Sequence, residues 1–207
     1  MSDEIVFYHN PRSRAQMAHW MLEEVGAPYK TVLLDFEKGE HKTPQFLAVN
    51  PMGKLPAIVH RGVVVTETAA IIAYLADAFP EAGLAPPPGD PSRGAYYRWL
   101  FFGAGCFEPA LLDRMLGRPD VESKMAVGYG SYEDVIAALK TALAKGPYLL
   151  GDKFTAADLY VGSEIHWAMT FGASGLKGEP VFDDYVARII DRPAAKRAGE
   201  QDANGQY

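Results

Sequence analysis

A proline-rich stretch near the middle of the chain divides the sequence into two parts. Five prolines stand between residues 80 and 92: Pro80, Pro86, Pro87, Pro88 and Pro91. Proline fixes the backbone φ angle and has no N–H to donate, so no packed helix or central strand continues through such a stretch. We therefore predict a first domain over residues 1–80, a linker over 81–92 and a second domain over 93–207.

The first part begins with strand, helix and strand patterns. Residues 5–8 are short, apolar and aromatic, which predicts a buried strand. Residues 13–25 carry an apolar stripe at helical spacing, and Gly26 suits the position just past a helix end. Residues 31–34 form a second β-rich run. Because a helix crosses over between these strands, they should run parallel.

The remainder of the first part completes a recognisable order of elements. We expect a short or irregular helix over 43–49, a hairpin of strands over 56–60 and 63–65, and a helix over 67–79 that stops at Pro80. This is the order of a thioredoxin-like domain.

Helical patterns continue from the linker to the end of the chain. We expect helices over 93–115, with a kink or break at Pro109, and over 132–145, 155–171 and 181–191, with a short piece from Ala194. The predicted fold class is α/β plus all-α: an N-terminal thioredoxin-like domain followed by an all-helical C-terminal domain.

Composition excludes several classes of function. The 207 residues are 48% hydrophobic and 22% charged with a net charge of −6, which disfavours nucleic acid and anionic membranes as partners. No apolar run is long enough to span a bilayer, and the acidic N-terminus lacks a signal core, so we expect a cytoplasmic protein. The single cysteine, Cys106, excludes a Cys-x-x-Cys pair. The five histidines show no metal-ligand spacing, so we expect no metal.

Two short motifs suggest a peptide-binding site. A cis bond before Pro56 would turn the Leu55 backbone outward to pair with an extended ligand, whereas a trans proline would simply open a strand. Thr66-Glu67-Thr68 lies where a strand becomes a helix, and helix N-termini bind carboxylates. Thr68 could hold a carboxylate and Glu67 the ammonium beside it, as a γ-glutamyl group requires. The alternative is that Thr66 is only an N-cap.

Two further clusters fit the same site. His41 and Lys42, together with Lys54, could contact a terminal carboxylate, or they could form a solvated charge run. Ser13 begins the first helix, and its hydroxyl could stabilise a thiolate or act only as an N-cap. One hydrogen bond to a charged group contributes about 1.5–3 kcal/mol, enough to lower a thiol pKa by about one to two units.

In this order and spacing the clusters resemble a cytosolic glutathione transferase. The most specific stretch covers residues 40–57, followed by Thr66-Glu67-Thr68, and it is close to the pattern of the phi and related bacterial classes. Residues 148–158 resemble the signature of the family's second domain, in which Thr155 and Asp158 form a capping box. The sequence has Glu-Thr where the family usually has Glu-Ser.

The resemblance implies a role for each residue of the site. Leu55 pairs with the cysteinyl part of glutathione across a cis Pro56, and Glu67 with Thr68 holds the γ-glutamyl end. The glycyl carboxylate lies near His41, Lys42 and Lys54. Ser13 is the predicted catalytic residue, and the groups also within reach of the thiol are Tyr8, Asn10, Arg12 and Arg14.

The electrophile should dock against the helical domain. The candidates are aromatic or sulfur-containing side chains that could equally belong to the bundle core: Tyr97, Phe101, Phe102, Cys106 and Trp167. The expected activity is conjugation of glutathione, as co-substrate, to a small apolar electrophile, with peroxide reduction as a side activity and a role in detoxification. A non-catalytic ligand-binding or interaction protein is the alternative. The family usually forms homodimers, and we expect one here.

Overall fold

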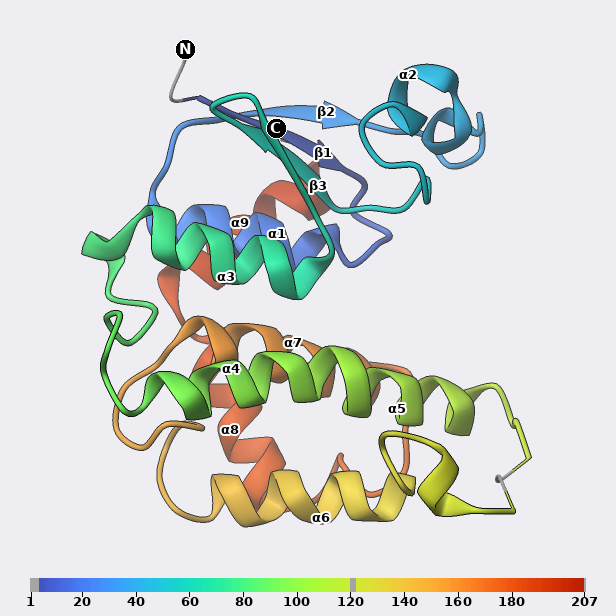
Figure 1. Ribbon diagram of the computed structural model, residues 1–207, viewed down its shortest axis with the longest axis vertical. Coiled ribbons are helices and arrows are strands. Elements are labelled where there is room, and N and C mark those ends of the chain that lie inside the picture. Colours follow the sequence, from blue (N-terminus) through green and yellow to red (C-terminus); the bar gives the residue numbers. More distant parts are fainter. Residues whose placement is uncertain (1–3, 120–121, 207) are drawn as a thin grey trace. The chain divides into compact units, whose positions relative to one another are not determined.

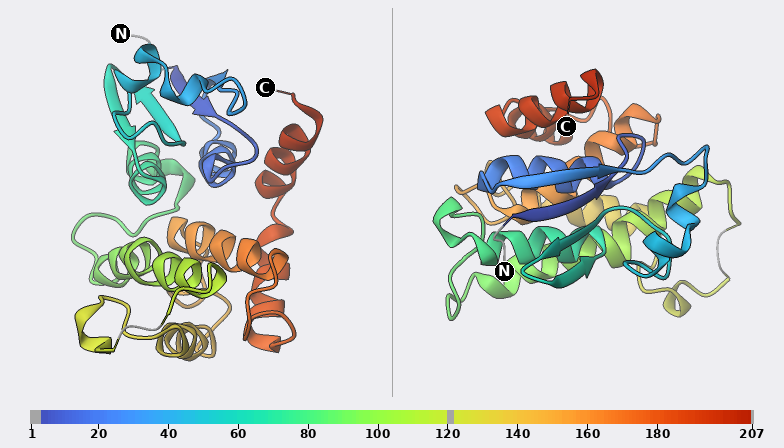
Figure 2. Two further views of the ribbon diagram at one scale, coloured as in Figure 1. Left: turned by 90° about the vertical axis from the view of Figure 1, so that its right-hand side faces the viewer. Right: turned by 90° about the horizontal axis from the view of Figure 1, so that it is seen from above.

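The chain forms two compact units, which the computed structural model describes over residues 4–119 and 122–206. The first unit comprises residues 1–83 and 191–207, and the second comprises residues 84–190 (Figure 1). This division differs from the predicted domains at the C-terminal end. Residues 191–207 join the first unit because α9 (Pro193–Asn204) packs along α1 (Ala15–Val25), as Figure 2 also shows.

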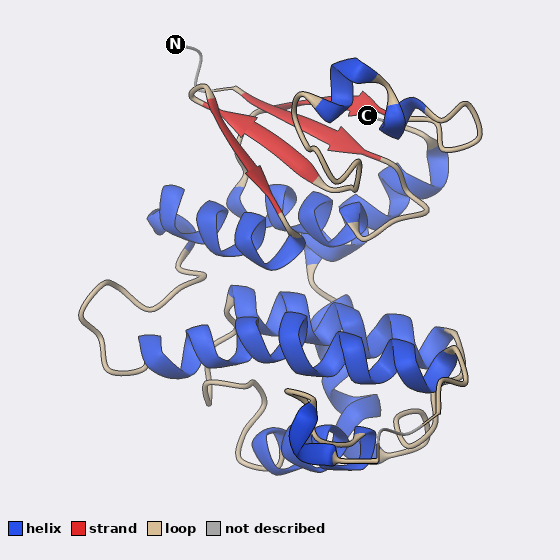
Figure 3. Cartoon of the chain, turned by 45° about the vertical axis from the view of Figure 1, so that its right-hand side comes forward, coloured by secondary structure: helices blue, strands red, loops and turns tan. Residues whose placement is uncertain are grey.

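A four-stranded mixed sheet forms the centre of the first unit (Figure 3). Its strands are β1 (Ile5–His9), β2 (Tyr29–Leu33), β3 (Ala57–His60) and β4 (Val63–Thr66), in the order β2-β1-β3-β4. β1 and β2 are parallel, which confirms the prediction from the crossover helix. β3 runs antiparallel to both β1 and β4, and the predicted hairpin is confirmed.

Two helices of the first unit, α1 and α3 (Thr68–Ala78), lie against one face of this sheet (Figure 1). α1 ends as predicted at Gly26, whose φ of +64° is the left-handed conformation that glycine adopts without a steric penalty. The short α2 (Pro44–Leu47) begins where the Thr43 side chain accepts from the Phe46 N–H. Single 3₁₀ turns, η1 (Glu40–Lys42) and η2 (Pro80–Ala82), complete this unit.

The second unit is helical, as predicted. Its helices are α4 (Arg93–Phe102), α5 (Glu108–Met115), α6 (Tyr132–Leu143), α7 (Ala156–Thr170) and α8 (Pro180–Ile190), with a 3₁₀ turn η4 (Lys124–Ala126). No helix among the described residues combines the length and apolarity needed to cross a bilayer.

The interruption predicted at Pro109 takes the form of a π-helical turn, η3 (Gly103–Phe107), just before it. Because Pro109 has no N–H, it cannot bond the carbonyl of Gly105 one turn earlier. The Glu108 N–H instead reaches the carbonyl of Gly103, five residues back. The expected single helix is therefore two helices joined by a widened turn.

A buried carboxylate fixes the start of α7 and confirms the predicted capping box. Asp158 is 0% exposed and accepts from the Thr155 N–H at 2.9 Å. It also accepts from the Leu149 N–H at 2.7 Å and from the Tyr185 hydroxyl at 3.0 Å. Burial raises the pKa of Asp158, although these donors act in the opposite direction.

Candidate functional site

The candidate site lies at one end of the sheet, where the strand register brings three loops together. Tyr8 pairs with Ala57, and Ala57 pairs with Thr66, so these residues form one row across β1, β3 and β4. Beyond this row β1 leads to the loop before α1, β3 is preceded by Pro56, and β4 leads into α3. The sheet therefore gathers segments that lie far apart in the sequence.

The peptide bond between Leu55 and Pro56 is cis, which confirms the expectation from the resemblance. Within the part of the chain that the structure describes, the Leu55 N–H and carbonyl make no hydrogen bond. They remain available to pair with an added extended peptide. The loop before them is held by Asn50, which is 3% exposed, donates to the Lys54 carbonyl at 2.8 Å and accepts from the Met52 N–H at 3.1 Å.

The basic residues of η1 lie against this same loop. The Lys42 ammonium donates to the Met52 carbonyl at 2.8 Å, so part of its role is to order the turn at Met52–Gly53. The His41 ring meets Phe36 edge-on with centroids 5.0 Å apart, and its buried Nδ1 has no hydrogen-bond partner among the described residues. Lys54 is exposed. The structure thus brings Lys42 to the loop that carries Lys54.

The turn from β4 into α3 has an unusual backbone. Glu67 has a φ of +67° and a ψ of +123°, a conformation that side-chain-bearing residues rarely adopt and that clusters at functional sites. The residue in the N-cap position is Glu67, not Thr66, and it makes no side-chain cap bond. Thr68 opens α3 and is 9% exposed. An exposed carboxylate thus stands beside a hydroxyl and the unpaired N–H groups of a helix start.

Ser13 does not occupy the predicted N-cap position of α1, because the helix begins at Ala15 and Arg14 is the N-cap residue. Its hydroxyl donates to the Asn10 carbonyl at 2.7 Å and accepts from the Ala15 N–H at 3.1 Å. Asn10 is 7% exposed, accepts from the Arg12 N–H at 2.8 Å and donates to the Leu34 carbonyl at 2.8 Å. These bonds fix the loop that follows β1 against the end of β2. The Ser13 hydroxyl proton must therefore leave the Asn10 carbonyl before it can be donated to a ligand.

The other residues that were predicted to lie near a bound thiol have different surroundings. Arg12 is exposed and pairs with Glu37 at 3.1 Å, an ion pair of the kind that contributes little to stability. Arg14 is half-buried in the N-cap position of α1. The Tyr8 ring packs on Phe46 with centroids 5.3 Å apart.

The predicted electrophile-site residues belong to the second unit and differ in exposure. Phe101 is 73% exposed and Tyr97 39%, so neither is a core residue of that unit. Phe102 packs on Trp99 and Trp167 packs on Phe171, with centroids 5.2 and 5.0 Å apart. Cys106 is half-buried in the π-helical turn, with its sulfur 3.7 Å from the Gly128 carbonyl.

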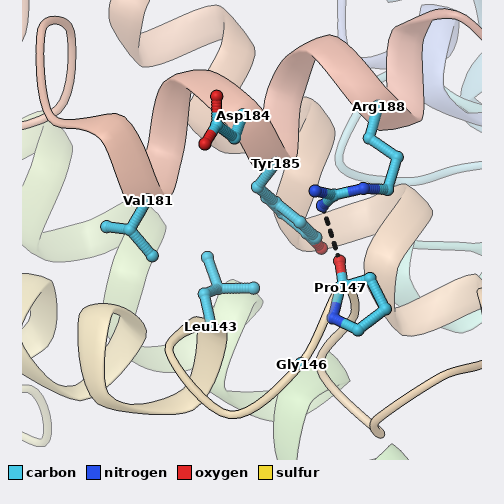
Figure 4. Close-up of a pocket in the computed structure, with 7 residues that line it drawn as sticks. All are labelled: Leu143, Gly146, Pro147, Val181, Asp184, Tyr185 and Arg188. Atoms are coloured by element: carbon cyan, nitrogen blue, oxygen red, sulfur yellow. Dashed lines mark hydrogen bonds between the residues drawn. The ribbon is translucent and has the colours of Figure 1, made fainter.

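A pocket of about 180 Å³ lies within the second unit (Figure 4). The Arg188 guanidinium donates to the Pro147 carbonyl at 2.9 Å across its rim. Its lining contains none of the predicted site residues and consists of Leu143, Gly146, Pro147, Val181, Asp184, Tyr185 and Arg188.

A cluster of buried histidines, which the sequence did not predict, lies at the end of β1 and within α1. His9 Nε2 lies 2.8 Å, and His19 Nδ1 2.7 Å, from the same carboxylate oxygen of Asp202 on α9. Both histidines are 0% exposed. No local spacing signals this group, because its members are separated by 10 and 183 residues along the chain.

Comparison with known proteins gives consistent matches. The family models for the N-terminal and C-terminal domains of glutathione S-transferases match residues 4–77 and 130–193. A probable glutathione S-transferase of Oryza sativa, GSTF2, is 31% identical over 188 residues, which cover 86% of this chain and 86% of that protein.

Solved structures agree along nearly the whole chain. The glutathione transferase URE2P6 of Phanerochaete chrysosporium, in complex with oxidized glutathione, has a TM-score of 0.81 at 27% identity and covers 98% of both chains. A sphingomonad glutathione S-transferase complexed with glutathione has a TM-score of 0.78 at 30% identity, covering 96% of this chain and 98% of the other.

Proposed function

This chain belongs to the glutathione S-transferase family, and we propose that its first unit binds glutathione at the Leu55–Pro56 segment and ionises the thiol for attack on an apolar electrophile. The observation that carries the proposal is the row formed by Tyr8, Ala57 and Thr66. The row supports the proposal because Leu55, Glu67 and Asn10 all lie within two residues of it along the chain.

The two ends of glutathione carry different charges, and the site offers a group suited to each. Glu67 offers a carboxylate to the ammonium of the γ-glutamyl group, while Thr68 and the start of α3 offer donors to its carboxylate. His41 and Lys54, with Lys42 ordering the loop between them, are the contacts for the glycyl carboxylate. Leu55 pairs with the cysteinyl backbone, which directs the thiol toward the β1–α1 loop.

Ser13 is the group that stabilises the thiolate. A hydrogen bond to a charged sulfur contributes about 1.5–3 kcal/mol, but Ser13 gives up its bond to the Asn10 carbonyl, which is worth about 0.5–1.5 kcal/mol. The net gain of roughly 1–1.5 kcal/mol lowers the thiol pKa by about one unit from about 8.5. At pH 7 the ionised fraction then rises from about 3% to about 25%.

The test is conjugation of chlorodinitrobenzene by the wild type and by Ser13→Ala. We expect kcat/KM at pH 7 to fall roughly eightfold in the variant, with its apparent pKa about one unit higher, so that the two rates converge at high pH. The matched control is Ser92→Ala, which alters an exposed serine that precedes α4. Equal pH profiles for wild type and Ser13→Ala would remove Ser13 from the mechanism.

Binding is tested separately with Thr68→Ala. Loss of a charge-assisted hydrogen bond should weaken glutathione binding about ten- to hundredfold, measured by calorimetry. Unchanged affinity would contradict the assignment of the γ-glutamyl end to α3.

A second candidate function, ligand binding without catalysis, is favoured by one observation. The Ser13 proton is already donated to the Asn10 carbonyl at 2.7 Å. If that bond persists with ligand bound, glutathione would raise the melting temperature while no conjugation is detected. Measuring both properties on one preparation distinguishes the two functions.

The assembly and location of the protein are extensions of the same proposal. We expect a homodimer in the cytoplasm acting in detoxification. The sedimentation mass should then be about twice the 22.6 kDa of one chain, and a monomer mass at micromolar concentration would contradict the dimer.

A further inference from the structure

Three side chains behind the β1–α1 loop present the atoms that bind transition metals. They are His9 at the end of β1, His19 within α1 and Asp202 within α9. One ligand atom from each lies within 4.8 Å of the other two. Two imidazole nitrogens and a carboxylate oxygen suit Zn²⁺ and its neighbours better than Mg²⁺ or Ca²⁺, which prefer oxygen ligands alone.

The cluster is enclosed by the packing of the first unit. The side chains of His9, His19 and Asp202 are 0%, 1% and 5% exposed. α9 lies along α1 (Figure 2), and it is this contact that brings Asp202 to the two histidines. Such a low-dielectric surrounding strengthens the attraction between a cation and a carboxylate.

An outer layer of hydrogen bonds orients one of the histidines. The second ring nitrogen of His19, Nε2, lies 2.9 Å from the hydroxyl of Tyr29. Tyr29 in turn donates to the Glu23 carboxylate at 2.8 Å, and Arg197 of α9 donates to that carboxylate at 2.9 Å. Histidines that bind metals are held in this way, with the remaining ring nitrogen bonded to a fixed partner.

We propose that His9, His19 and Asp202 form a three-ligand site for a divalent transition metal of the Zn²⁺ type. His9 contributes Nε2, His19 contributes Nδ1 and Asp202 contributes Oδ1. Three protein ligands leave a fourth position for water or another small ligand. This site is independent of the glutathione-binding function proposed above.

The change that the cluster must undergo is small. Metal bonds of about 2.0–2.2 Å at tetrahedral angles place neighbouring ligand atoms about 3.3–3.6 Å apart. The nitrogen–oxygen distances here are 2.8 and 2.7 Å, so each nitrogen must move away from the carboxylate oxygen by about 0.5–0.9 Å. The metal takes the place of the protons that the two ring nitrogens share with Asp202. His19 releases its Nδ1 proton to solvent, and His9 gives up its Nε2 proton to solvent while Nδ1 takes one up, so that both bind as neutral imidazoles.

Metal binding at this site would join the two ends of the first unit. His9 and Asp202 are 193 residues apart in the chain, so one ion would link β1 to α9. A ligand that binds only the folded protein stabilises it in proportion to the logarithm of its concentration. The expected effect is therefore a rise in melting temperature that a chelator reverses.

The experiment is a Co²⁺ titration of the full chain without an affinity tag, followed by visible absorption. We expect one equivalent to produce the intense absorption of four- or five-coordinate Co²⁺, and Zn²⁺ to abolish it. Asp202→Asn and His19→Gln should each weaken Zn²⁺ binding at least tenfold. His166→Gln, which changes an exposed histidine of the second unit, is the matched control and should bind as the wild type does.

Two measurements keep the test decisive if a ligand variant fails to fold. The wild-type titration needs no variant, and the absence of Co²⁺ absorption at saturation would overturn the proposal. Tyr29→Phe leaves all three ligands in place but removes the hydroxyl that orients His19, so it should weaken binding about ten- to hundredfold. Equal affinity of the wild type, Asp202→Asn and His19→Gln would show that surface groups bind the metal, and would also overturn it.

Discussion

Replacing Gly53 with alanine should destabilise the loop that is proposed to bind glutathione. Gly53 has a φ of +59°, and an added Cβ would lie 2.7 Å from the His41 carbonyl and 2.6 Å from the Lys42 ammonium. The lysine can move only by giving up its bond to the Met52 carbonyl, and the carbonyl is main chain. The left-handed backbone costs about 1–2 kcal/mol and the overlap about 1–3 kcal/mol. We therefore expect Gly53→Ala to lower the free energy of unfolding by about 2–5 kcal/mol.

The control for this prediction is Gly39→Ala. Gly39 has a similar φ of +70°, but no atom lies within 4 Å of its added Cβ. It should therefore show only the backbone cost of about 1–2 kcal/mol. Urea unfolding of both variants isolates the overlap at Gly53, and calorimetry should show weaker glutathione binding in Gly53→Ala alone. Equal losses of stability in the two variants would refute the contact between the Met52–Gly53 turn and η1.

Two further predictions concern the second unit. Asp158→Ala should lower the free energy of unfolding by about 2–4 kcal/mol, because it removes a helix cap and leaves the buried Leu149 N–H unpaired. Urea unfolding measures this loss, and the exposed control Asp152→Ala should show almost none. Gly162→Ala should cost about 1–3 kcal/mol, since its Cβ would lie 2.1 Å from Ile189 Cδ1. Adding Ile189→Val, which removes that methyl group, should then recover stability in a double-mutant cycle, and a failure to recover would contradict the packing of α7 on α8.

Most segments of the candidate site could be predicted because their signals are local in the sequence. Each signal occupies only a few residues. The signals are a proline at a strand start, a glutamate between two threonines at a strand-to-helix junction, and a serine before a helix. The crossover rule then fixes β1 parallel to β2, as the structure confirms. What the sequence could not supply is the register that aligns Tyr8, Ala57 and Thr66, since pairing depends on the packing of the whole sheet.

The features that escaped prediction depend on contacts between distant segments. The sequence predicts a short final helix in the second domain, whereas α9 runs from Pro193 to Asn204 and packs on α1 in the first unit. The cluster of His9, His19 and Asp202 exists only because of that packing. Spacing rules detect metal ligands on one helix or one loop, and they give no signal for ligands brought together by tertiary structure.

The hydrogen bonds that Ser13 makes before the start of α1 are compatible in physical terms with the proposed role of thiol activation. The hydroxyl accepts from the Ala15 N–H and donates to the Asn10 carbonyl, so these two bonds fix the oxygen just before the start of α1. Redirecting the proton to a ligand requires only a rotation about the Cβ–Oγ bond, and the acceptor bond that holds the oxygen is retained. In the proposed mechanism these bonds would supply the pre-organisation that thiol activation needs, and the cost of redirecting the proton would limit the lowering of the thiol pKa to about one unit instead of two.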